Sequence, residues 1–94
     1  MGMKRVARMF VVLNEKGLTL LFATLLARET ARFKSDVVIG HGNEVYRATQ
    51  VLGVLSMGVS KGEVFTVATE GPDATAAMRA VMAWSRACAT EVSL

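Results

Sequence analysis

The sequence predicts an α+β fold in which the elements follow one another in the order βαββαβα. Three observations predict this order: valine-rich runs typical of strands, apolar residues repeating at helical spacing between them, and glycine-containing turns at the junctions. The 94 residues, of which 52% are hydrophobic, suffice for a single core. We therefore expect one folded domain that spans residues 1–94.

The first strand and the first helix are predicted from the N-terminal third of the chain. Residues 5–13 are rich in valine and carry Phe10, which suits a strand, and residues 14–17 form a turn cluster. Thr19 is a suitable N-cap for the helix that follows. The buried stripe of this helix is predicted from the 3, 4, 7 and 10 spacing of Ala23, Leu26, Ala27, Thr30 and Phe33.

The remaining elements follow from similar signals. Residues 35–47 contain two short apolar runs around a Gly-His-Gly-Asn turn, which predicts an antiparallel hairpin. A short helix is expected over residues 49–57, although Gly53 inside it lowers its helix propensity, and a strand over residues 62–71. A last helix begins after Pro72 and Asp73. Its apolar stripe is Ala77, Val81, Trp84 and Cys88.

The element order and several short stretches resemble the HPr phosphocarriers of the bacterial sugar phosphotransferase system. The stretches are "KGLT", "RFKSDVVI", "GN", "VLGVLSMGVSKGEVFTV" and "TEGPDA", in matching order and spacing between about Phe10 and Met82. The resemblance implies an open-faced β-sandwich, with a four-stranded antiparallel sheet and three helices on one face.

The resemblance also locates two phosphorylation sites of the family, and both are degenerate in this chain. The family motif reads histidine, any residue, arginine, proline, alanine, and its histidine carries the phosphoryl group. The matching residues here are Thr19, Leu20, Leu21, Phe22 and Ala23. The regulatory serine of the family corresponds to Gln50, and the neighbouring hydroxyls of Thr49 and Ser56 are out of register.

Phosphoryl relay at the first helix requires a nucleophilic imidazole, free amide groups and a cationic side chain. Only the helix N-terminus is retained, because Thr19 replaces the histidine and Leu21 the arginine. Thr19 is no substitute, since a phosphothreonine ester holds its phosphoryl group far more firmly than a phosphoimidazole does. His41 is the only histidine, and we interpret it as a residue of the hairpin turn, with an alternative phosphoacceptor as the other interpretation.

Apolar side chains stand at and around the positions where the family has its phosphorylation site. Leu21, Phe22 and Leu25 lie partly off the core stripe of the first helix, and Val54 and Met57 are expected to point inward from the second. The two helices then present a joint apolar face, which is typical of a protein interface. We predict that a protein partner or a second copy binds to Leu20, Leu21, Phe22, Leu25, Val51, Leu52 and Leu55.

Two functions follow for the chain. The first is a non-catalytic HPr-like adaptor or regulator that is not an enzyme and uses no cofactor and no metal. The alternative is a phosphocarrier with an altered or displaced acceptor site. The net charge of +3 raises nucleic-acid binding as a third function, but the sequence does not favour it, because the basic residues are scattered. The arginines that such binding would use are Arg5, Arg8, Arg28, Arg32 and Arg47.

Composition excludes further classes. The longest nearly uncharged stretch, residues 17–27, is far shorter than the roughly 20 residues of a membrane span. Cys88 is the only cysteine, so no intramolecular disulfide can form, and a reducing cytoplasm is expected.

Overall fold

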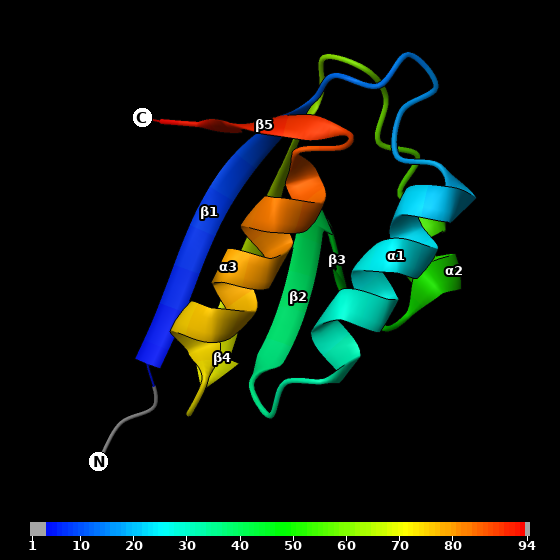
Figure 1. Cartoon of the computed structure of the whole chain (residues 1–94). Coiled ribbons are helices and arrows are strands. Elements are labelled where there is room, and N and C mark those ends of the chain that lie inside the picture. Colours follow the sequence, from blue (N-terminus) through cyan, green and yellow to red (C-terminus); the bar gives the residue numbers. More distant parts are fainter. Residues whose placement is uncertain (1–3, 94) are drawn as a thin grey trace.

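In a computed structural model, which describes residues 4–93, the chain forms a five-stranded sheet and three helices. In Figure 1 the helices lie over one face of the sheet, α3 in front of β1 and β4 and α2 beside α1. The elements, in chain order, are β1 (Lys4–Val12), α1 (Leu20–Ala31), β2 (Asp36–His41), β3 (Glu44–Arg47), α2 (Val51–Ser56), β4 (Val64–Gly71), α3 (Ala74–Ser85) and β5 (Ala89–Val92).

The sheet is antiparallel throughout, with the strand order β3-β2-β4-β1-β5. The central strand β4 pairs with β1 on one side, where Phe10 lies opposite Phe65, and with β2 on the other, where Ile39 lies opposite Val67. All four of these side chains are buried and face the helices. The expected α+β architecture with helices on one face is therefore confirmed.

The core lies between this sheet face and the three helices. The rings of Phe10 and Phe65 stack with centroids 5.3 Å apart, and Trp84 of α3 meets Phe65 edge-on at 6.0 Å. Such aromatic pairs add stability beyond their buried area. The stripe predicted for α1 is largely correct: Leu26 and Ala23 are fully buried.

The C-terminal segment differs from the sequence prediction. The sequence predicts a four-stranded sheet and a last helix that includes Cys88, but α3 ends at Ser85 and β5 adds a fifth strand beside β1. Cys88 is buried in the turn between them, and its carbonyl oxygen accepts hydrogen bonds from the amides of Leu13 and Asn14, at 2.9 and 3.2 Å. A buried residue at helical spacing was therefore mistaken for part of the helix.

Smaller differences affect the hairpin and α2. Gly40 and His41 belong to β2, so that the turn reduces to Gly42 and Asn43, with Gly42 at a φ of 60°. The helix α2 is shorter than residues 49–57, and Val54 and Met57 are buried as expected.

Gly53 has a packing role in α2. A β-carbon at this position would collide with the ring of Tyr46 on β3. The glycine thus allows α2 to lie close against the sheet, which offsets its low helix propensity.

Asp73 connects the loop before α3 to the loop between α1 and β2. Both loops lie at the opposite end of the domain from the start of α1. Its carboxylate accepts hydrogen bonds from the amides of Lys34 and Ser35, at 3.0 and 2.8 Å, and from the Ser35 hydroxyl at 2.6 Å. These hydrogen bonds, that of the Ser35 hydroxyl foremost, lower the pKa of Asp73 below its ordinary value. The N-terminus of α3 is thereby fixed to the start of β2.

Candidate functional site

The loop that precedes α1 is held in place by backbone contacts. The amide of Leu18 donates to the carbonyl of Val59 at 2.9 Å, and Asn14 Nδ2 donates to the carbonyl of Gly17 at 2.9 Å. Gly17 has a φ of 76°, and a β-carbon there would collide with the Val59 carbonyl. The N-terminus of α1 is therefore positioned by the segment that leads from α2 into β4.

Thr19 is the N-cap residue of α1, as predicted. Its φ and ψ are −78° and 172°, and its carbonyl accepts the first helical hydrogen bond, from the amide of Ala23 at 2.9 Å. Its hydroxyl makes no capping hydrogen bond. The amides of the first turn, Leu20 to Phe22, have no acceptor within the helix, so this end retains the partial positive charge of a helix N-terminus.

The side chains around these amides are apolar and only some of them are exposed. Leu20 is 54% exposed, Leu21 62% and Leu52 of α2 76%. Phe22 and Leu25 are half-buried and pack against the core. Val51 also packs against the core, and Leu55 is half-buried. The predicted joint apolar face is therefore well exposed only at Leu20, Leu21 and Leu52.

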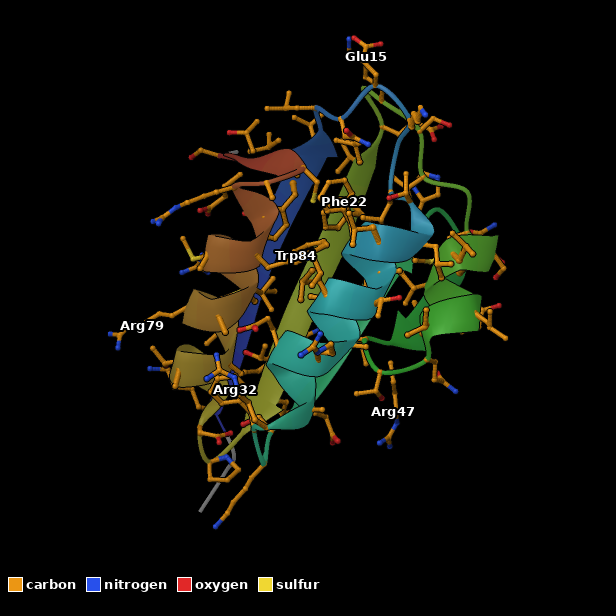
Figure 2. All side chains as sticks on the ribbon, turned by 45° about the vertical axis from the view of Figure 1, so that its right-hand side comes forward. Glu15, Phe22, Arg32, Arg47, Arg79 and Trp84 are labelled. Carbon is orange, nitrogen blue, oxygen red and sulfur yellow. The ribbon has the colours of Figure 1, made fainter. Side chains whose placement is uncertain are left out.

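Phe22 is tied to the core by its backbone as well. The indole Nε1 of Trp84 on α3 donates a hydrogen bond to the Phe22 carbonyl at 2.9 Å. Figure 2 shows the two side chains close together between α1 and α3. Phe22 therefore helps to join the two helices, a role that its sequence position did not reveal.

The second degenerate position, Gln50, is the N-cap residue of α2 and is exposed. Its Oε1 accepts a hydrogen bond from the amide of Arg47 at 3.0 Å, which closes the turn after β3. The Ser56 hydroxyl donates to the carbonyl of Gly53 at 2.6 Å, at the far end of α2. The apolar and polar residues at the start of α2 line a shallow depression of about 430 Å³: Tyr46, Thr49, Gln50, Val51, Leu52 and Gly53.

His41 lies at the end of β2, where its ring is fixed on both sides. Nδ1 lies 2.9 Å from the Val64 carbonyl, and because a carbonyl only accepts, Nδ1 carries the proton. Nε2 lies 3.6 Å from a carboxylate oxygen of Glu63. A phosphoryl group on Nε2 would face that negative charge, which argues against His41 as a phosphoacceptor.

The five arginines considered for nucleic-acid binding are divided among three elements: Arg5 and Arg8 on β1, Arg28 and the C-cap Arg32 on α1, and Arg47 on β3. Arg8 pairs with Glu91 at 3.4 Å, Arg32 with Glu29 at 2.8 Å and Arg47 with Asp36 at 3.6 Å. Arg32 and Arg47 point in different directions in Figure 2. The described residues therefore offer scattered, partly neutralised charges instead of one basic patch.

Comparison with known proteins identifies the family. The family model "PTS HPr component phosphorylation site" matches residues 6–86, which is most of the chain. The chain belongs to the HPr family. The match also extends the resemblance beyond the limits of about 10 and 82 that the sequence motifs indicate.

Solved HPr structures agree with this assignment. The phosphocarrier protein HPr from Bacillus anthracis is 30% identical and has a TM-score of 0.77, with 85% of this chain and 95% of that chain covered. An HPr dimer from Thermoanaerobacter tengcongensis is 28% identical, with coverage of 81% and 87% and a TM-score of 0.69. A histidine-containing phosphocarrier protein from Mycoplasma shares the fold at 22% identity, with coverage of 87% and 91% and a TM-score of 0.79.

Membership of the HPr family connects the chain to the phosphotransferase system. The comparisons support the family's phosphocarrier role more strongly than a purely non-catalytic one. The start of α1 departs from that role, because threonine and leucine stand where the family motif has histidine and arginine. Within residues 4–93, no helix is long and apolar enough to span a membrane.

Proposed function

We propose that this HPr-family chain acts in the phosphotransferase system by docking a protein partner through α1 and α2, without a phosphohistidine at the start of α1. The observation that carries the proposal is the replacement of the histidine and arginine at this helix N-terminus by Thr19 and Leu21, together with exposed Leu52 on the neighbouring helix α2. Burial of one exposed leucine is worth roughly 1.5 to 3 kcal/mol. A few such residues support a specific contact. In this proposal the chain is not an enzyme and acts in the cytoplasm.

A second candidate is a phosphocarrier with an altered acceptor, and the family match favours it. The open amides of the first turn of α1 still suit an anion. The acceptor would have to be a group other than a histidine at position 19, and His41 is disfavoured by Glu63. The two candidates differ in one measurable property, which is stable acceptance of a phosphoryl group.

The first experiment measures that property. The chain is incubated with phosphoenolpyruvate and enzyme I of the phosphotransferase system, and its intact mass is recorded at neutral pH, where phosphohistidine survives. We expect no mass gain. A stoichiometric gain of one phosphate would overturn the proposal in favour of the second candidate, and digestion with peptide mapping would then locate the acceptor.

The variant Thr19→His tests which neighbours matter. We expect slow or incomplete phosphorylation, because Leu21 supplies no positive charge to the phosphoryl oxygens and Phe22 is packed against the core. Phosphorylation of Thr19→His as fast as that of an ordinary HPr would show that the histidine alone was missing.

Docking is tested with enzyme I as the named partner. The dissociation constant is measured by calorimetry for the chain and for a Leu21→Glu/Leu52→Glu variant, in which both changes fall on well-exposed side chains. We expect binding to weaken at least about tenfold. A matched control, Ala31→Glu/Ala76→Glu, adds the same charge at exposed positions away from the face and should bind normally. An equal loss of affinity for enzyme I in both variants, or no binding of enzyme I by the parent chain, would count against docking through this face.

A further inference from the structure

The face of the sheet opposite the helices is unusually apolar for a surface exposed to water. In an antiparallel sheet with one solvated face, strands alternate apolar and polar residues. Here the outward positions of β1 and β4 are Ala7, Met9 and Val11 in β1 and Val64, Thr66 and Ala68 in β4, with charged residues only at one end, Arg5 and Glu70. Val64 is 39% exposed. Strands that are apolar on both sides are typical of sheets covered on both faces.

We infer that a second copy of this chain covers this open face. The two sheets then pack face to face about a two-fold axis that lies between them, parallel to β4. Because β4 is the third of five strands, such an axis lays β2 of one copy over β1 of the other, and β3 over β5. The surface involved is the one opposite α1 and α2, so the inference does not depend on the docking proposed above.

Register partners on neighbouring strands lie side by side and form rows that cross the sheet. These rows show which residues of the two copies face each other. The middle row of the open face runs Val45, Gly40, Thr66, Met9 and Val92 from β3 to β5. Rotation about β4 reverses this order in the second copy. The long side chain of Met9 in one copy then faces Gly40, which has no side chain, in the other, and Thr66 faces its own counterpart.

The next row shows the same size matching. It runs Arg47, Val38, Ala68 and Ala7 across β3, β2, β4 and β1. After rotation, Val38 of one copy faces Ala7 of the other, and the two Ala68 methyl groups meet near the axis. Beside the axis, Met9 and Val38 therefore lie opposite the smaller Gly40 and Ala7, as close packing of two sheets about 10 Å apart requires.

The charged residues of the end row are complementary in the same orientation, and within its own copy Asp36 also pairs with Arg47 at 3.6 Å. The end row runs Asp36, Glu70 and Arg5 across β2, β4 and β1. Rotation places Asp36 of each copy opposite Arg5 of the other, which gives two intermolecular ion pairs. The two Glu70 side chains approach each other near the axis, with an arginine on either side.

The size of the face predicts how strong this association is. With strands about 4.8 Å apart and rows of residues about 6.8 Å apart, the outward positions in the register cover on the order of 500 Å² per copy. The total of about 1,000 Å² lies at the lower limit for a specific interface, so we expect a dissociation constant on the order of 10 to 100 µM.

Sedimentation equilibrium over a wide range of protein concentrations tests the dimer. The parent chain should dimerise, and Thr66→Lys, which places two like charges on the axis at an exposed position, should weaken the dimer roughly a hundredfold. Leu21→Glu/Leu52→Glu on the helix side should leave the dimer unchanged. A parent chain that is monomeric up to millimolar concentration would overturn the inference, and so would a dimer lost only in the helix-side variant.

A charge-swap pair tests the orientation of the two sheets. The variants Arg5→Glu and Asp36→Lys each create two like-charged contacts in their own dimers, so each alone should dimerise less than the parent. Mixed in equal amounts they should form a heterodimer, because the new glutamate of the first variant then faces the new lysine of the second, and the other contact keeps its parental charges. Thermal melting of each variant checks that the fold is retained. Failure of the mixture to associate better than either variant alone would refute the axis along β4.

Discussion

Replacement of Trp84 by phenylalanine tests how α3 is joined to α1. Trp84 is 7% exposed, donates its indole N–H to the Phe22 carbonyl at 2.9 Å, and meets the Phe65 ring edge-on at 6.0 Å. Trp84→Phe preserves an aromatic ring toward Phe65 but removes the donor and part of the buried volume. The variant therefore tests the hydrogen bond between α3 and α1 while it keeps an aromatic contact with Phe65.

Two contributions lower the free energy of unfolding in this variant. The lost hydrogen bond is worth about 1 kcal/mol, because the Phe22 carbonyl still accepts within α1 and is not left without a partner. The smaller ring adds about 1 to 2 kcal/mol through lost burial and a residual cavity. We expect the free energy of unfolding to fall by about 2 to 3 kcal/mol, and the melting temperature by about 10 to 20 °C.

The assay is urea unfolding followed by far-ultraviolet circular dichroism, because Trp84 is the only tryptophan and its fluorescence disappears in the variant. Ala83→Ser, at the exposed neighbouring position, is the matched control and should change stability by less than about 0.5 kcal/mol. A loss below about 0.5 kcal/mol in Trp84→Phe would refute the reasoning that this side chain joins α1 to α3.

Three further predictions concern the rest of the domain. Gly53→Ala should lower stability by about 1 to 3 kcal/mol in urea unfolding, because the new methyl group collides with Tyr46; a gain would show that the ring moves aside freely. Asp73→Asn should be less stable than the parent at pH 7, because it loses the charge that accepts from Ser35. Since the folded pKa of Asp73 lies below 3.8, the parent keeps this contribution above that pH and loses it as the pH falls through the folded pKa, so melts at several pH values should converge in acid. Burial raises the pKa of the Cys88 thiol to about 11, so a thiol reagent should modify native protein far more slowly than urea-unfolded protein, and equal rates would place Cys88 at the surface.

The sequence alone determined the order of the first seven elements. Each of these elements is marked by a local signal: valine-rich runs form strands, apolar residues at helical spacing form helices, and glycines end them. The family motifs added the helix-on-one-face architecture, and the absence of histidine and arginine at the start of α1 could be read directly from Thr19 and Leu21. The N-cap position of Thr19 followed from the same local pattern.

Only the tertiary structure decided what depends on contacts between distant segments. Residues 89–92 contain a single valine and no apolar run that marks a strand, and they become β5 because β1 offers them an edge to pair with. Trp84 donates a hydrogen bond to the Phe22 carbonyl 62 positions earlier, a contact between α3 and α1 that no spacing within α1 could reveal. The open face likewise depends on register, since the alignment of β1, β2 and β4 sets which side chains share a row. Helical and strand periodicity is a property of neighbours in sequence, whereas burial and pairing are properties of neighbours in space.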